Sequence, residues 1–162
     1  MKRFTLITLV VLMTLLATIG TALAAESTTV YRTGLSGEAA GSGSDAHGNA
    51  VFMFKDDGSE MKYKLVVNGL DDVFMAHIHV AEEPGGNGPV VLWLYPDAPP
   101  PSLIEGTFNG LLGSRTVTSD DLVGPLAGMS FDDLRAAIEQ GRAYVNVHTT
   151  AFPPGEIRGT IH

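Results

Sequence analysis

Short apolar segments alternate with clusters of turn residues along most of this sequence, and that pattern limits the folds open to it. Asp56-Asp57-Gly58 separates two such segments in the manner of a hairpin. Met61 to Val67 is the next predicted strand, ended by Asn68-Gly69, and Leu103 to Phe108 is a shorter one further on. Proline- and glycine-rich stretches at 84–89 and 96–101 interrupt the pattern. The spacing predicts an all-β fold, a Greek-key sandwich or barrel of about eight strands. Val90 to Tyr95 is almost wholly apolar, which predicts a buried strand with Trp93 in the core.

One segment shows a helical pattern instead. Ser130 is a suitable N-cap, and Asp133 can complement the free amides of the first turn. Apolar residues recur at helical spacing after Ser130, and Gly141 is placed to end the helix. We therefore expect one short helix near Phe131–Gln140.

Residues 1–24 have the pattern of a signal peptide. Lys2 and Arg3 precede an apolar run, and Ala22-Leu23-Ala24 is a small-x-small cleavage site. The run is short for a bilayer span, so no membrane span is expected after cleavage. The sequence thus predicts export, to the periplasm or out of the cell, of one β domain covering residues 25–162.

The composition of that domain excludes some partners. Removing residues 1–24 leaves eight of the ten Lys and Arg residues against 18 Asp and Glu residues, a net charge of −10. Such a surface repels phosphate backbones, so nucleic-acid binding is not expected. The chain has no cysteine, so disulfides cannot stabilise it and a cysteine nucleophile is excluded. Neither a Gly-x-Ser-x-Gly elbow nor a Walker loop occurs, and we assign no catalytic residue.

Three histidines lie on the polar sides of two predicted strands. Side chains alternate between the two faces of a strand. In F-M-A-H-I-H-V, His77 and His79 share one face, and the other face carries Phe74, Ala76, Ile78 and Val80. In A-Y-V-N-V-H-T, His148 points away from the face that carries Ala143, Val145 and Val147. If these strands are neighbours, the three imidazoles can meet on the side opposite the core.

The chemistry of three imidazoles favours a transition metal. Residues i and i+2 of a strand lie about 6.6 Å apart on one face, so two rings can converge on one ion. Nitrogen ligands suit copper or zinc, whereas calcium and magnesium prefer oxygen. The alternative is that His77, His79 and His148 are surface residues on a solvated sheet face. His47, in a Gly/Ser-rich loop, and the terminal His162 are interpreted as ordinary surface residues.

Two segments resemble the CHRD (chordin-type) domain family. They are A-H-I-H-V-A-E-E-P-G-G-N-G-P-V-V, residues 76–91, and G-R-A-Y-V-N-V-H-T-T-A-F-P-P-G-E-I-R-G-T-I, residues 141–161. The resemblance extends over nearly all of the predicted domain. It implies an exported all-β domain.

The same strands also resemble, more distantly, the copper/zinc superoxide dismutases. The run G-L-D-D-V-F-M-A-H-I-H-V is similar to the strand that carries two copper ligands there, and G-R-A-Y-V-N-V-H to a later ligand strand. The resemblance implies copper ligands at His77, His79 and His148. The segment from Ala81 to Pro89 holds no histidine, so the bridging histidine and zinc loop are missing, and Arg158 is the nearest candidate for a substrate-guiding arginine.

These observations lead to one principal hypothesis and one alternative. The principal hypothesis is an exported CHRD-type binding or structural module that holds one copper ion, or zinc as second choice, through His77, His79 and His148. Its partner would be an extracytoplasmic protein or a small ligand. The alternative is a copper-dependent redox enzyme related to superoxide dismutase.

Overall fold

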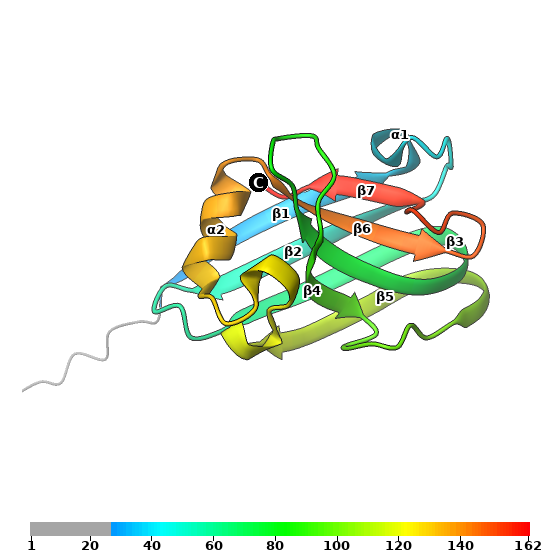
Figure 1. Cartoon of the computed structure of the whole chain (residues 1–162). Coiled ribbons are helices and arrows are strands. Elements are labelled where there is room, and N and C mark those ends of the chain that lie inside the picture. The colour runs from blue at the N-terminus through cyan, green and yellow to red at the C-terminus, as the bar shows by residue number, and fades with distance from the viewer. Residues whose placement is uncertain (1–26) are drawn as a thin grey trace, which may run out of the picture.

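The structure is a computed structural model that describes residues 27–162. The predicted signal peptide lies outside the described residues. The described part contains seven strands, two α-helices and two 3₁₀ turns, Ser119–Asp121 and Gly124–Leu126 (Figure 1). The strands are β1 (Thr28–Ser36), β2 (His47–Lys55), β3 (Met61–Val80), β4 (Val90–Tyr95), β5 (Ile104–Val117), β6 (Ala143–Thr149) and β7 (Ile157–Thr160). The helices are α1 (Gly37–Ala40) and α2 (Phe131–Glu139). The all-β fold with a short helix at 131–139 is confirmed, and the one-turn helix α1 is an addition.

The sheet closes on itself. Every strand pair is antiparallel, and β1, β2, β3, β6 and β7 follow one another around a barrel. The last contact of the ring joins β7 to β1 through the pair Ser36 and Arg158. Reciprocal backbone bonds between Arg32 and His162, 2.8 and 3.0 Å long, continue this contact. Strands β4 and β5 pair with β3 outside the ring. Closure removes exposed sheet edges from the ring strands.

The long strand β3 organises the sheet. Its first half pairs with β2 and β5, and its second half pairs with β6 and β4. The sequence predicts two strands here, ending the first at Asn68-Gly69. That prediction is wrong because the chain bends without leaving the sheet: Gly69 and Asp72 adopt positive φ angles of 73° and 53°. Leu70, between them, still pairs with Phe108 on β5.

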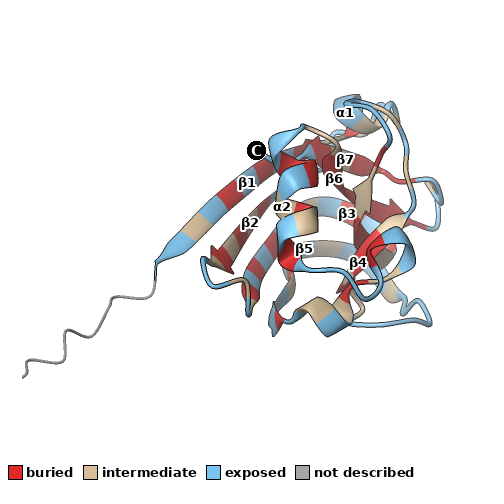
Figure 2. Cartoon of the chain, turned by 60° about the vertical axis from the view of Figure 1, so that its left-hand side comes forward, coloured by how far each residue is buried: buried red, intermediate tan, exposed pale blue. Residues whose placement is uncertain are grey.

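The core fills the barrel, and Figure 2 shows the buried residues as red bands along the strands. Val145 and Val147 of β6 are fully buried, as are Ala76 and Ile78 of β3, so their predicted inward direction is confirmed. Strand β4 supplies Val91, Leu92 and Leu94 to the core. Trp93 is only half-buried and lies on the opposite side, so its predicted place in the core is wrong.

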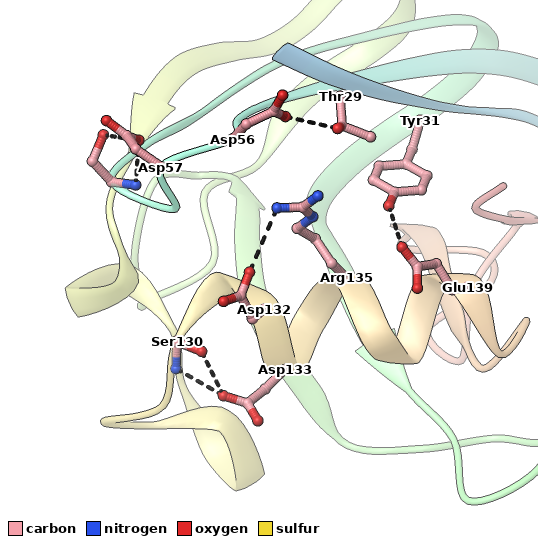
Figure 3. Close-up of polar contacts among 10 residues, drawn as sticks. Thr29, Tyr31, Asp56, Asp57, Ser130, Asp132, Asp133, Arg135 and Glu139 are labelled. Atoms are coloured by element: carbon pink, nitrogen blue, oxygen red, sulfur yellow. Dashed lines mark hydrogen bonds and ion pairs between the residues drawn. The ribbon is translucent and has the colours of Figure 1, made fainter. Parts of the chain in front are cut away.

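Helix α2 lies across one end of the barrel, beside β1 and β2 (Figure 1). Its Phe131 ring packs edge-on against Phe54 of β2, with centroids 5.6 Å apart. The hydroxyl of Tyr31 donates to a carboxylate oxygen of Glu139 at 2.9 Å, tying the helix to β1 (Figure 3). At the other end of α2, Ser130 and Asp133, which the sequence predicts to cap the helix, form a capping box (Figure 3).

Two loops join the strands that carry the histidines to their neighbours. Residues 81–89 connect β3 to β4, and residues 150–156 connect β6 to β7. Backbone bonds anchor the first loop at both ends, from Ala81 to the carbonyl of Arg142 and from Val80 to the carbonyl of Pro89. Within residues 27–162, no helix is long and apolar enough to cross a membrane.

Candidate metal centre

The pairing of β3 with β6 brings the three predicted histidines together. Asn146 is opposite His77, and Tyr144 is opposite His79. His148 is opposite Met75, two residues before His77. The antiparallel pairing that the site requires is therefore present, and all three histidines lie on the side away from the barrel core.

The ring nitrogens of His77, His79 and His148 converge. One ligand atom from each residue lies within 4.8 Å of the other two. One pair, His77 Nδ1 and His148 Nε2, is within hydrogen-bond distance at 3.3 Å. Two nitrogens that share one ion at about 2.0 Å with a near-tetrahedral angle lie about 3.3 Å apart. The spacing of this pair suits a common ion without backbone movement.

Backbone carbonyls fix the tautomers of two rings. His79 Nδ1 donates to the carbonyl of Gly88 at 2.9 Å, and His148 Nδ1 donates to the carbonyl of Pro153 at 2.8 Å. A carbonyl oxygen only accepts, so each Nδ1 carries the proton and each Nε2 presents a lone pair. Histidines that bind metals characteristically make such a bond through the other ring nitrogen.

The histidines do not lie on a solvated face. His77 is 2% exposed and His148 is 5% exposed. The Nε2 atoms of His77 and His79 are buried without a hydrogen-bond partner in the described part of the chain. The sequence-based alternative of three surface histidines is thus wrong for His77 and His148, and the bonds to Gly88 and Pro153 show that the two loops lie over this side of the sheet.

Burial disfavours the charged form of every ring in the cluster. It lowers the pKa of His77 to about 3, with the neighbouring His148 and His79 adding to the shift. Burial also lowers the pKa of His79, against the bond to Gly88, with further contributions from His148 and Arg158. For His148, burial lowers the pKa although the bond to Pro153 opposes it. The rings are therefore neutral near pH 7, the form that binds a metal ion.

Aromatic rings surround the cluster, and sequence reasoning missed them. Trp93 lies edge-on to His77, with centroids 4.2 Å apart. Tyr144 stacks on His79 at 4.9 Å and 9° between the planes. The ring centroid of Phe74 is 6.4 Å from that of His148. Phe74 was expected on the core side, but the pairing shifts between Val73 and Met75 and breaks the alternation.

The other histidines lie apart from the cluster. His47 begins β2, His162 ends the chain, and both are exposed. Neither belongs to the group of three, as the sequence predicts. The loop over the site carries Glu82 and Glu83, which are exposed as well. Within residues 27–162, the cluster of possible metal ligands consists of imidazoles alone.

Together these features define an exclusively antiparallel β-barrel domain with a covered three-histidine cluster on its outer face. The chain belongs to the CHRD domain family, whose model matches residues 31–161. No curated protein and no solved structure shows a significant match to the chain. The predicted family is therefore confirmed, and the similarity to superoxide dismutases stays a prediction.

The structure explains two glycines in residues 141–161, the second of the two segments that resemble the CHRD family. A Cβ at Gly155 would lie 2.0 Å from Oδ1 of Asn146, and one at Gly159 would lie 2.2 Å from the carbonyl oxygen of Gly34. Between them, Glu156 is buried and accepts bonds of 2.6 Å from the hydroxyls of Ser44 and Thr149. This segment thus holds β7 and the loop over His148 close to the barrel.

Proposed function

We propose that this protein is an exported CHRD-type binding module that holds one transition-metal ion through His77, His79 and His148, with copper preferred to zinc. The convergence of three ring nitrogens within 4.8 Å on the covered side of the sheet carries the proposal. Neutral imidazoles are ligands for these metals, and backbone carbonyls fix the tautomers of His79 and His148. Copper is placed first because divalent copper binds nitrogen sites more tightly than zinc does.

The burial of the cluster supports a binding role. His77 and His148 are almost fully buried, and an unpartnered buried nitrogen is costly unless a ligand satisfies it. At His79, a bound ion would take up the Nε2 lone pair that no hydrogen bond uses. Covering loops also limit exchange with solvent, which suits retention of an ion.

Calorimetric titration of the purified protein with Cu(II) at neutral pH tests the proposal. We expect one ion per chain, with binding impaired in each of His77→Ala, His79→Ala and His148→Ala. His47→Ala is the matched control, because it removes an exposed histidine outside the cluster, and it should bind as the wild type does. Wild-type binding by the triple variant, or no binding by the wild type, would contradict the proposal.

The alternative function is a copper-dependent redox enzyme related to superoxide dismutase. Three nitrogen ligands leave a coordination position for a substrate, as in catalytic metal sites. Superoxide turnover by the copper-loaded protein that disappears in His148→Ala would support the enzyme. Tight binding without turnover would favour the binding module.

A further inference from the structure

We propose that Arg158 is the positioning residue of the histidine cluster, acting on His79 through Tyr144 and through the turn at Gly86–Gly88. This inference rests on the proposed metal site, but it concerns how the protein holds one ligand. It also gives Arg158 a role other than guiding a substrate.

The first link is a stack of three side chains. The guanidinium carbon of Arg158 lies 3.5 Å from the centroid of the Tyr144 ring. The Tyr144 ring is in turn nearly parallel to the imidazole of His79. A guanidinium over an aromatic face is attracted by the ring quadrupole, and the contact strengthens when water is excluded. Arg158 thereby holds Tyr144 in the plane that His79 packs against.

The second link runs through the backbone of the covering loop. Arg158 donates from one terminal nitrogen to Oδ1 of Asn87 at 2.7 Å and from the other to the carbonyl of Gly86. The Tyr144 hydroxyl accepts a bond of 3.1 Å from the amide of Gly88. The carbonyl of Gly88 then accepts the Nδ1 proton of His79. Arg158 and Tyr144 thus fix the turn that sets the tautomer of His79.

The packing around this turn leaves little freedom. A Cβ at Gly88 would lie 1.9 Å from the carbonyl oxygen of Val80, so only glycine fits there. Both terminal nitrogens of Arg158 are engaged by the loop, and the face of the guanidinium is covered by Tyr144. The Arg158 guanidinium is therefore fully engaged by the loop and by Tyr144. A substrate anion could bind to it only by displacing these contacts.

Arg142 offers a matched control. It also bonds to the covering loop, from a terminal nitrogen to the carbonyl of Ala81 at 3.1 Å. Its other side-chain bond goes to Gln140. Arg142→Gln removes the same charge and one anchor of the same loop, without changing the Arg158–Tyr144–His79 stack.

The test measures Cu(II) affinity and, separately, the metal-free imidazole of His79 by long-range ¹H–¹⁵N NMR. We expect Arg158→Gln to weaken Cu(II) binding about 10- to 100-fold, the range for partners that orient metal ligands. We expect Arg142→Gln to bind as the wild type does. In the NMR experiment, the wild type should show His79 as the Nδ1-protonated tautomer, and Arg158→Gln should show a mixture. Arg158→Lys, which keeps a cation but not the fork of donors, should fall between them.

Two results would overturn the inference. One is wild-type affinity and an unchanged His79 tautomer in Arg158→Gln. The other is an equal loss of affinity in Arg142→Gln, which would show a general effect of anchoring the loop. If Arg158→Gln does not fold, Arg158→Lys and Tyr144→Phe replace it, since both keep most of the packed volume. If the wild type binds no metal, the proposed function fails, and the tautomer of His79 still decides the role of Arg158.

Discussion

His77 Nδ1 lies 3.3 Å from His148 Nε2, although 71 residues separate the two histidines in the sequence. Because Nδ1 of His148 donates to Pro153, its Nε2 has only a lone pair, so His77 Nδ1 must be the donor in this contact. A metal ion that binds both nitrogens would displace that proton, which could move to His77 Nε2, a buried nitrogen without a hydrogen-bond partner. The contact is thus both a hydrogen bond of the fold and the source of two of the three nitrogens in the candidate metal centre.

The free energy of unfolding should fall as the pH drops below about 6.5, the ordinary pKa of histidine. The folded state lowers the pKa of His77 to about 3 and also lowers those of His79 and His148. Between the folded and unfolded pKa values, the unfolded chain binds more protons, so acid favours unfolding. Above that window both states are neutral, and the histidine contribution is constant.

Urea unfolding between pH 7.5 and 5 measures this dependence, since most carboxylates titrate lower. Each histidine contributes a slope of at most about 1.4 kcal/mol per pH unit. His77→Gln should reduce the slope, because it removes a group whose pKa is lowered in the folded state. The same slope in wild type and His77→Gln would contradict the assignment.

Val147→Asp should destabilise the protein by about 3 kcal/mol or more, because it places a carboxylate without a partner in the core. Val147 is fully buried on β6, one residue before His148. Val30→Asp is the matched control, since Val30 is a strand residue that is 42% exposed. Chemical unfolding of both variants tests the prediction, and equal stabilities would refute the inward direction of Val147.

The sequence predicts the parts of the site that depend on alternation along a strand. His77 and His79 share the side opposite Ala76 and Ile78, and His148 lies opposite Val147, as period-two patterning requires. The family resemblance covers nearly all of the predicted domain, and the family model matches residues 31–161. The face on which a strand residue lies depends on its position along that strand, so the sequence alone predicts it.

What covers the histidines could not be predicted in the same way. Alternation tells which side a residue faces, but the buried His77 ring is surrounded by side chains from other parts of the chain, among them Trp93 and His148. The sequence places Trp93 in the core because its strand is almost wholly apolar, yet Trp93 is opposite His77 in the pairing of β3 and β4, on the side away from the buried Leu92 and Leu94. Gly88 and Arg158 both lie in the segments that resemble the CHRD family, residues 76–91 and 141–161. A sequence motif, however, does not state which contacts its residues make.

The strand content of β5 was also underestimated, for a related reason. The sequence predicts a strand from Leu103 to Phe108, whereas β5 continues to Val117. Gly110 and Gly113 interrupt the apolar pattern of the second half. Gly113 is needed because a Cβ there would lie 2.4 Å from the carbonyl oxygen of Leu94. The glycine that this close backbone contact requires also interrupts the apolar pattern, so the sequence predicts too short a strand.

Gly88→Ala should weaken both folding and Cu(II) binding. The added Cβ would lie 1.9 Å from the carbonyl oxygen of Val80, so the turn must move and take the Gly88 carbonyl away from His79. Overpacking of this kind costs about 1–3 kcal/mol, and loss of an orienting bond weakens metal affinity about 10-fold or more.

Gly34→Ala is the control for this variant, because its nearest neighbour would be Oδ1 of Asn49 at 3.9 Å. Thermal unfolding and copper titration should show a loss in Gly88→Ala only. Unchanged copper affinity in a folded but destabilised Gly88→Ala would show that the Gly88 carbonyl does not orient His79.

Copper at the proposed site should quench the fluorescence of Trp93, the only tryptophan of the chain. The Trp93 and His77 rings have centroids 4.2 Å apart, so an ion on His77 would lie beside the indole. Cu(II) has an incomplete d shell and can accept an electron from an excited ring, whereas Zn(II) is d¹⁰ and redox-inactive.

Fluorescence should fall with Cu(II) until one ion per chain is bound, and Zn(II) should produce little quenching while competing for the site. His148→Ala should require more Cu(II) for the same effect, and His47→Ala should match the wild type. Copper that binds by calorimetry yet leaves Trp93 unquenched must lie away from His77, and the three-histidine site would then be wrong.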